Sequence, residues 1–349
     1  MPDYFIYEFN ELVTDQELGN ATLILGNGAS MAVSSSFSYT NLFGKACNDS
    51  ILNQTSKNLF ETLQTTDFEL VMNKLRQAYI INEVLQLDTD NVALHTYDNI
   101  RQSLIKTIKE IHNESWNECS ENPERAVIIE KNSEALLQRV RLIKNAKEEI
   151  ILSTFAFKSD ESDRKPYKMK DCFTNHIDGN LGFEYDIEKL REPYNGGPDP
   201  TLVFYPHGNL ILASNENNDE LKIRINNNTN LFDAIGEKWK LKYVPLFVSE
   251  GSSEQKLKAI RRSTYLNFVY ENVLSHLEPT VIIYGWKLAE QEQHLIKKIF
   301  SNNKISNVYI SMYLGSNPEP IDEQKRIASM LKRENRTMNI KFFDAASKN

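Results

Sequence analysis

Cysteine is scarce in this chain of 349 residues, and its three cysteines, Cys47, Cys119 and Cys172, lie far apart. No C-x-x-C pair occurs, so the sequence offers neither a disulfide framework nor a cysteine-based zinc site. So few unpaired cysteines are typical of a reducing compartment. We therefore expect a cytoplasmic protein that holds no metal.

Long apolar runs are also missing. No stretch approaches the ~18 uncharged apolar residues that a transmembrane helix requires. The first residues, Met-Pro-Asp-Tyr-Phe-Ile-Tyr-Glu, carry acids and lack the apolar segment of a signal peptide. We expect no contact with a membrane.

Positive charge is in deficit, because 40 Lys and Arg stand against 48 Asp and Glu, which gives a net charge of −8. Proteins that bind nucleic acids usually show a basic excess or a basic stripe, and neither is found. A nuclease is therefore a weak third hypothesis. The sequence also lacks a G-x-x-x-x-G-K-[ST] loop, which argues against a P-loop nucleotide hydrolase.

The clearest positive feature is an alternation of short apolar runs with amphipathic stretches. We expect strands at residues 21–26, 150–152, 201–212 in two pieces, 222–225, 246–248, 281–285, 308–312 and 340–343. Helices are expected within 55–112, at about 136–143, 254–277, 288–301 and 321–335, and a loop at 113–133. This alternation predicts an α/β protein with a Rossmann-like, doubly wound, mainly parallel sheet. We expect a single domain over 1–349, with a helical insertion at about 45–125 and a long loop at about 158–200.

A glycine-rich turn follows the first predicted strand. It comprises Gly26, Asn27, Gly28, Ala29 and Ser30. Glycine allows a sharp turn and a close approach to an anion, and the N-terminus of the next helix offers free N–H groups. We expect these residues to bind the phosphates of a nucleotide. The full G-x-G-x-x-G pattern is incomplete, since Met31 replaces its third glycine, so a tight strand-to-helix turn is the alternative reading.

Two further strand ends carry polar or glycine residues. His207 lies between Pro206 and Gly208 directly after a predicted strand, where an imidazole can act as a base near neutral pH. A hydrogen-bonded loop histidine is the alternative. Gly285 and Trp286 follow another strand, and Glu290, Glu292 and His294 come next. Since acids are favoured in the first helical turn, a plain strand-to-helix connection explains the glutamates equally well.

These motifs together resemble a bacterial sirtuin-like (Sir2-type) NAD-hydrolase family that is classed as a domain of unknown function. The resemblance spans nearly the whole chain. It rests on residues 25–30, 37–39, 42–43, 66–69, 205–210, 248–251 with Lys256, and 285–294. Asp67, in the 66–69 region, reads either as a helix cap or as a ligand contact.

The resemblance implies a protein that binds NAD and cleaves the bond between nicotinamide and ribose. It implies that His207 acts in the site and that the Gly26–Ser30 turn, with Asp67, Gly285 and Trp286, holds the dinucleotide. Stand-alone bacterial relatives look like antiphage defence effectors that deplete NAD. An accessory or sensor protein and a homo- or hetero-oligomer would fit such a role.

The resemblance also implies an asparagine, at the end of the 150–157 strand, that positions the attacking water. Phe155 occupies that place, and phenylalanine cannot form the hydrogen bond. Asn175 and Asp178, in the long predicted loop, are the candidates to replace it. The alternative function is a catalytically impaired subunit that binds NAD or another nucleotide and senses or assembles with a partner.

Overall fold

The structure of the chain is a computed structural model. It describes residues 5–12, 21–29, 36, 38–87, 90–120, 149–152, 169–175, 181–193, 200–215, 217–223, 231–248, 251–314 and 320–345. The chain divides into two compact units. The sheet unit comprises Met1–Ala32, Asn132–Val248 and Lys256–Asn349, and the helical unit comprises Val33–Lys131 and Ser249–Gln255.

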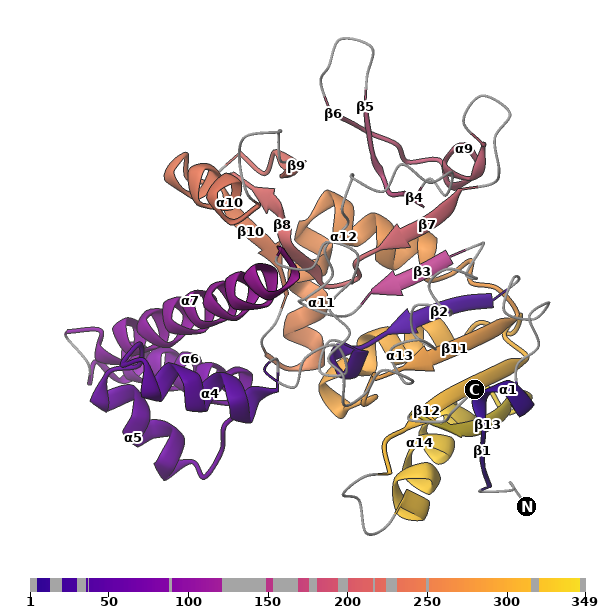
Figure 1. The fold of residues 1–349 in the computed structure, drawn as a ribbon, viewed down its shortest axis with the longest axis horizontal. Coiled ribbons are helices and arrows are strands. Elements are labelled where there is room, and N and C mark those ends of the chain that lie inside the picture. Colours follow the sequence, from indigo (N-terminus) through magenta and orange to yellow (C-terminus); the bar gives the residue numbers. More distant parts are fainter. Residues whose placement is uncertain are drawn as a thin grey trace. The chain divides into compact units, whose positions relative to one another are not determined.

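The sheet unit is built on eight parallel strands (Figure 1). In spatial order these are β1 (Ile6–Tyr7), β13 (Asn339–Asp344), β12 (Asn307–Met312), β11 (Thr280–Tyr284), β2 (Ala21–Leu25), β3 (Glu149–Leu152), β7 (Thr201–Phe204) and β4 (Met169–Lys170). Every residue of β2 and β11 is buried, as expected for central strands that are covered on both faces. The predicted Rossmann-like α/β fold is confirmed.

The order of the strands defines where a ligand would bind in such a fold. Taken from β7 through β3, β2, β11 and β12 to β13, the six central strands follow the 3-2-1-4-5-6 order of the doubly wound dinucleotide-binding sheet. The order reverses between β2 and β11, which pair in parallel from Thr280 opposite Ala21 to Tyr284 opposite Leu25. The carboxyl ends of β2 and β11 therefore form the topological switch point.

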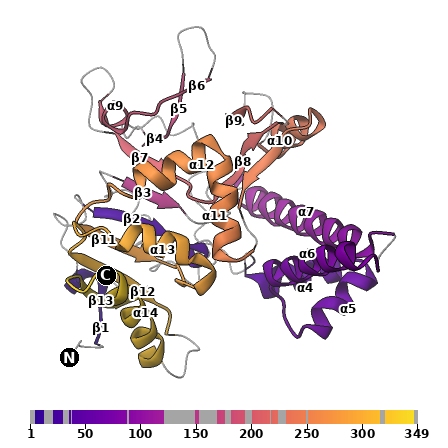
Figure 2. The ribbon, with the colours of Figure 1, turned by 180° about the vertical axis from the view of Figure 1, so that it is seen from behind.

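Helices cover the face of the sheet that is turned toward the viewer in Figure 2. They are α12 (Thr264–Phe268) with its π-helical continuation η3 (Val269–Val273), α13 (Gln293–Phe300) and α14 (Pro320–Glu334). α11 (Ser253–Arg262) comes before them, η4 (Glu290–Glu292) leads into α13, and α1 (Phe9–Leu12) follows β1. Apolar side chains of the sheet and of these helices form one core.

Two smaller sheets complete the sheet unit. The first joins β10 (Val244–Phe247), β8 (Gly208–Ser214) and β9 (Glu220–Lys222) in antiparallel fashion, and α10 (Leu231–Lys240) contributes Ala234 and Ile235 to its small core. The second pairs β5 (Phe173–Asn175) with β6 (Leu181–Phe183), and α9 (Ile187–Arg191) follows.

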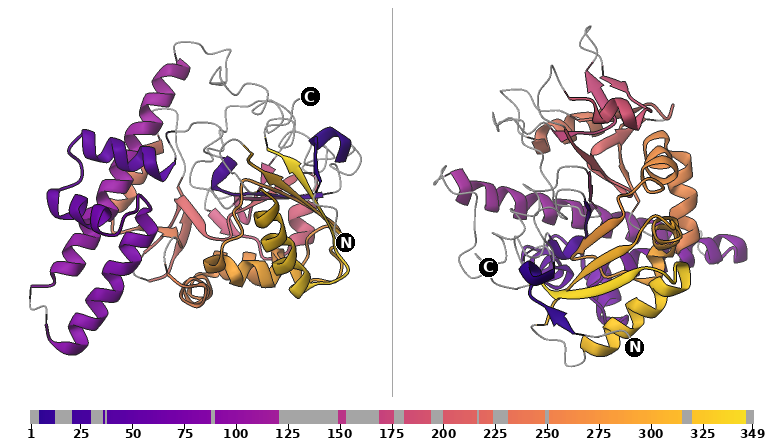
Figure 3. Two further views of the ribbon diagram at one scale, coloured as in Figure 1. Left: turned by 90° about the horizontal axis from the view of Figure 1, so that it is seen from below. Right: turned by 90° about the vertical axis from the view of Figure 1, so that its right-hand side faces the viewer.

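The helical unit contains α4 (Tyr39–Asn48), α5 (Gln54–Thr62), α6 (Phe68–Leu85) and α7 (Val92–Ser120). α6 and α7 lie side by side as an antiparallel hairpin (Figure 3). Phe60 and Phe68 meet edge to face in the interior of this unit, with ring centroids 4.9 Å apart.

Several sequence predictions need correction. α7 continues to Ser120, so residues 113–120 are helical rather than a loop. The expected loop at 158–200 contains β4, β5, β6 and α9 among its described residues. The helix expected over 254–277 breaks at Ser263, whose hydroxyl accepts the Leu266 N–H and starts a new helix. The helix expected from 288 begins at Gln293, because Leu288 has a φ of +51°.

The first small sheet and the edges of other elements also differ from the prediction. β10 pairs antiparallel with β8 rather than in the parallel sheet. β9 ends at Lys222, and residues 224–225 of the expected strand lie outside the described residues. α10 was not predicted. The helix expected at about 136–143 lies outside the described residues. The described helices include none long and apolar enough to cross a membrane.

Candidate functional site

Two glycine turns meet at the switch point. The Gly26 N–H donates to the Tyr284 carbonyl and the Gly28 N–H donates to the Gly285 carbonyl, both at 2.8 Å. The sequence of the turns explains the contact, because a Cβ on Gly26 would lie 2.4 Å from the Gly285 oxygen. Gly285 itself has a φ of +69°, and a Cβ there would lie 2.4 Å from the Ala29 nitrogen. Glycine is therefore required at these positions by the approach of one backbone to another.

This packing bears on the predicted phosphate site. The Gly28 amide is bonded to Gly285, and the Ala29 amide donates to the Gly26 carbonyl at 3.0 Å. These two amides of the turn are therefore engaged within the protein. Asn27 is half-buried beside them, and Ser30 lies outside the described residues. The phosphate-binding role of Gly26–Ser30 stays a prediction.

The loop that follows β11 is held from α14. The Arg326 guanidinium donates to the carbonyl oxygens of Leu288 at 3.1 Å and Lys287 at 2.9 Å. Glu323 accepts two further bonds from the same guanidinium, at 2.8 Å each. Trp286, predicted to contact the dinucleotide, is a buried member of the core. The loop is thus a fixed element at the carboxyl edge of the sheet.

Hydrogen bonds hold the backbone in place both before His207 and at His207 itself. The Tyr205 N–H donates to the Tyr265 hydroxyl oxygen of α12 at 2.9 Å, and the His207 carbonyl accepts the Val248 N–H at 2.8 Å. Gly208 has a φ of +73°, and a Cβ there would lie 1.9 Å from the Leu246 oxygen. The Pro-His-Gly sequence therefore makes a turn that only glycine can close.

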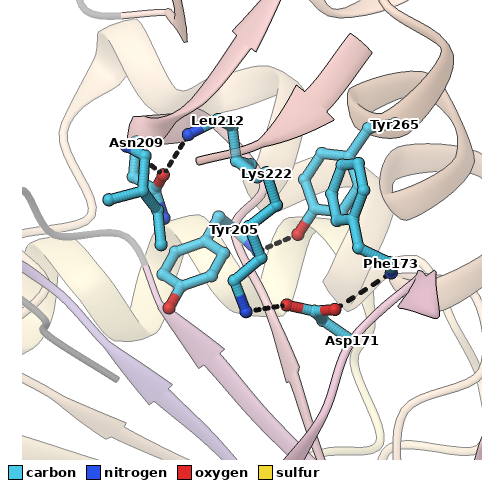
Figure 4. A network of polar contacts seen from close by, with 8 residues as sticks. Asp171, Phe173, Tyr205, Asn209, Leu212, Lys222 and Tyr265 are labelled. Carbon is cyan, nitrogen blue, oxygen red and sulfur yellow. Dashed lines mark hydrogen bonds and ion pairs between the residues drawn. The ribbon is translucent and has the colours of Figure 1, made fainter. Parts of the chain in front are cut away.

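Polar contacts brace the same turn from the neighbouring strands (Figure 4). The Asn209 side chain accepts the N–H groups of Ile211 and Leu212 at 3.0 Å. Lys222 of β9 reaches the Asp171 carboxylate at 2.7 Å, and the other oxygen of Asp171 accepts the Phe173 N–H at 2.9 Å. The Asn209 bonds fix the start of β8, which begins directly after His207, and the Lys222–Asp171 pair holds β9 against the segment before β5.

The imidazole of His207 belongs to a buried polar cluster of four side chains, which we call the His207 cluster: His207, Lys256, Glu292 and His294. The Nε2 atoms of His207 and His294 lie 3.0 Å apart. Glu292 Oε2 lies 3.6 Å from His207 Nε2, and Glu292 Oε1 accepts a bond from Lys256 Nζ at 2.7 Å. Lys256 is only 3% exposed and His294 5%. The cluster joins α11, the β11–α13 connection and the turn after β7.

Burial sets the charges in this cluster. Burial lowers the pKa of His207 below its ordinary value, and it lowers the pKa of His294 to about 3. Both imidazoles are therefore neutral at pH 7. Burial acts to raise the pKa of Glu292, but His207 and the Lys256 ammonium lower it by more. Glu292 is consequently a carboxylate, paired with Lys256.

The arrangement can hold and move a proton. Two neutral imidazoles whose Nε2 atoms face each other share one hydrogen, so one ring donates and the other accepts. The contact with His294 engages Nε2 of His207 and leaves its Nδ1 outside that contact. Glu292 Oε2 has no hydrogen-bond partner among the described residues and can stabilise a positive charge on His207. The cluster has the parts of a general base.

The other predicted site residues are less informative. Asp67 caps α6, since its Oδ1 accepts the Leu70 N–H at 3.2 Å, which agrees with the helix-cap reading. Asn175 ends β5, where its side chain is not described, and Asp178 and Phe155 lie outside the described residues. Within the part of the chain that the structure describes, no three His, Cys, Asp or Glu side chains are grouped as a metal site.

Sequence reasoning noted Lys256, Glu292 and His294 in motifs but did not predict that they join His207. The sequence did offer one signal: a polar residue, His294, stands directly before a run of apolar residues. His294 is the second residue of α13, and the next residues, Leu295 and Ile296, are buried in the core. A histidine and a lysine on the buried sides of two helices indicate a shared polar partner.

Comparison with protein families places the chain in a known family. The family model described as "Domain of unknown function (DUF4917)" matches residues 23–349 and so covers nearly the whole chain. No curated protein matches the chain.

Proposed function

We propose that this chain, which belongs to the DUF4917 family, is a sirtuin-like NAD glycohydrolase that cleaves the bond between nicotinamide and ribose. One observation carries the proposal. Three features follow the carboxyl ends of strands in one parallel sheet: His207, which can act as a base, and the two glycine turns. The strands of this sheet have the order found in dinucleotide-binding folds. In folds of this kind, ligands bind at that edge, next to the switch point.

Each part of the edge has a proposed role. The dinucleotide lies across the switch point, with its pyrophosphate at the glycine turn that follows β2. Because the Gly28 and Ala29 amides are engaged within the protein, Asn27 and the residues after Ala29 supply the remaining contacts. The neutral His207 acts on the water, and Glu292 stabilises the imidazolium that forms.

The reaction is a hydrolysis in which atoms and charges balance. The bond between the ribose C1′ and the nicotinamide nitrogen breaks, and its electron pair neutralises the cationic ring. The water oxygen bonds to C1′, and its proton passes to His207 and then to solvent. The products are ADP-ribose and nicotinamide. A positioned general base contributes about 10²–10⁴-fold to such a step.

The test is nicotinamide release from NAD by the purified full chain, followed by chromatography. We expect turnover in the wild type and a loss of about 10²-fold or more in His207→Gln. His95→Gln is the matched control, because His95 is an exposed histidine of α7. Absence of turnover, with and without extract of phage-infected cells, would reject the hydrolase.

Phe155 favours a second candidate, a subunit that binds NAD without cleaving it, because phenylalanine stands where the resemblance implies a water-positioning asparagine. Titration calorimetry separates the two. Binding of NAD that persists in His207→Gln, with no product in either protein, supports the second candidate. Absence of binding rejects both.

The resemblance further supports a defence role, in which NAD depletion arrests an infected cell. Expression in a bacterial host tests this role. We expect the wild type to lower cellular NAD during phage infection, and His207→Gln to leave NAD unchanged. Equal NAD levels in the two cultures would remove the defence role while leaving the enzymatic test intact.

A further inference from the structure

The end of the α6–α7 hairpin exposes a group of large apolar side chains. Val84 is 76% exposed and Leu87 is 70% exposed, although both are among the more hydrophobic residue types. Together with their neighbours they form what we call the α6 apolar face: Ile80, Ile81, Val84, Leu85, Leu87 and Val92. Clusters of exposed apolar side chains mark interaction sites on soluble proteins.

The side of α6 opposite this face is the one that packs into the core of the helical unit. Phe68, Val71, Met72 and Leu75 are buried within the helical unit. α6 is therefore apolar on two sides, and packing within the helical unit buries only one of them. The α6 apolar face is left for a partner.

Charges around the face indicate which partner. Lys74 and Arg76 precede it on α6, Glu83 lies within it between Ile81 and Val84, and Asp90 lies at its far end. All four are exposed, and none forms an ion pair with another described residue. The face thus runs from a basic end to an acidic end. A second copy that lies antiparallel would place basic against acidic at both ends, whereas a parallel copy would place like charges together.

We propose that the α6 apolar face binds the same face of a second copy of this chain, with the two α6 helices antiparallel about a two-fold axis. If the axis passes between Asn82 and Glu83, Ile80 lies opposite Leu85 of the other copy. The same register sets Arg76 opposite the turn that carries Asp90. Such an isologous contact builds a four-helix arrangement from two hairpins.

The first experiment measures the molar mass of the full chain by light scattering and sedimentation across a concentration series. The expected mass is twice the chain's 40.3 kDa at micromolar concentration. Val84→Glu, which puts a charge at the centre of the face, gives the mass of one chain. Leu241→Glu is the matched control, because Leu241 is 65% exposed outside the helical unit, and it leaves the dimer intact.

The second experiment tests the orientation. Arg76→Glu weakens the dimer by about tenfold, since each surface ion pair is worth about 0.2–1 kcal/mol and the two-fold axis creates two of them. Asp90→Arg weakens it similarly. The double variant Arg76→Glu with Asp90→Arg restores the wild-type dissociation constant, because both members of each pair are exchanged.

Three outcomes overturn the proposal. A monomeric wild type at tens of micromolar means that the face serves another occupant. A dimer that survives Val84→Glu, with circular dichroism confirming the fold, uses another surface. A double charge exchange that stays as weak as the single variants contradicts the antiparallel orientation. None of these measurements depends on NAD hydrolysis.

Discussion

His207 and His294 face each other through their Nε2 atoms at 3.0 Å, and both rings are buried and neutral at pH 7. Since a single hydrogen occupies that contact, the two rings must be opposite tautomers: one carries its proton on Nε2 and the other on Nδ1. His294 therefore acts as a positioning residue for His207. Because His207 and His294 are 87 residues apart in the sequence, only the fold could reveal that they are in contact.

This relationship gives the first prediction. Long-range ¹H–¹⁵N correlation spectra of the histidine rings at pH 7.5 should show one Nε2–H and one Nδ1–H tautomer for His207 and His294. In His294→Phe, which fills the space without a ring nitrogen, His207 should show both tautomers. His276→Gln, at an exposed histidine, should leave both signals unchanged. Identical tautomers in the wild type would contradict the contact.

The same histidines make stability depend on pH. Burial holds the folded pKa of both rings below the unfolded value of about 6.5, so the unfolded chain binds more protons below that pH. Stability is therefore complete above about pH 7 and falls as the pH drops below 6.5. Because the folded pKa of His294 is about 3, we expect this histidine to account for a loss of about 2 kcal/mol by pH 5, and His207 to add to the loss in the same direction.

Urea unfolding measured from pH 5 to 8 checks this slope. The window stays above the range in which Glu292 titrates, because its pKa is lowered from 4.5. His294→Phe should reduce the loss, since one of the two buried rings is gone. A stability that stays flat between pH 5 and 7 in the wild type would show that these rings are charged or exposed.

Lys256 and Glu292 form the charged half of the cluster, with 2.7 Å between Nζ and Oε1. Lys256→Met leaves the Glu292 carboxylate buried without its partner, which costs about 3–5 kcal/mol in comparable pairs. The double variant Lys256→Met with Glu292→Gln should recover most of that loss, because no charge remains buried. Urea unfolding at pH 7.5 measures both. Equal losses in the single and double variants would mean that packing, rather than charge, explains the effect.

The strands of the central sheet could be predicted from the sequence because each appears as a short apolar run. The mainly apolar runs 21–26, 281–285, 308–312 and 340–343 became β2, β11, β12 and β13. The glycines at the ends of β2 and β11 were also identified. Central parallel strands are read easily because burial on both faces leaves few polar residues to blur the pattern.

Prediction was weaker where tertiary contacts decide the local structure. Apolar periodicity runs through residues 254–277, yet Ser263 caps a new helix there, and Glu220 from β9 accepts the Thr264 and Tyr265 amides. Periodicity cannot register a cap supplied from 44 residues away. The His207 cluster escaped for the same reason, since its members come from three separate parts of the chain.

The glycine turns at the switch point give the last prediction, which separates packing from ligand binding. Gly285→Ala places a Cβ 2.4 Å from the Ala29 nitrogen at a φ of +69°. The left-handed backbone alone costs about 1 kcal/mol or more, and backbone displacement adds to it, so a loss of about 3 kcal/mol or more is expected.

Gly236→Ala is the matched control. Its Cβ would meet nothing within 4 Å on α10, so stability should rise by about 0.5–1 kcal/mol. Urea unfolding of both variants in the absence of nucleotide measures the difference. If Gly285→Ala were as stable as the wild type, the two turns would not touch, and the glycines would have to be explained by a ligand instead.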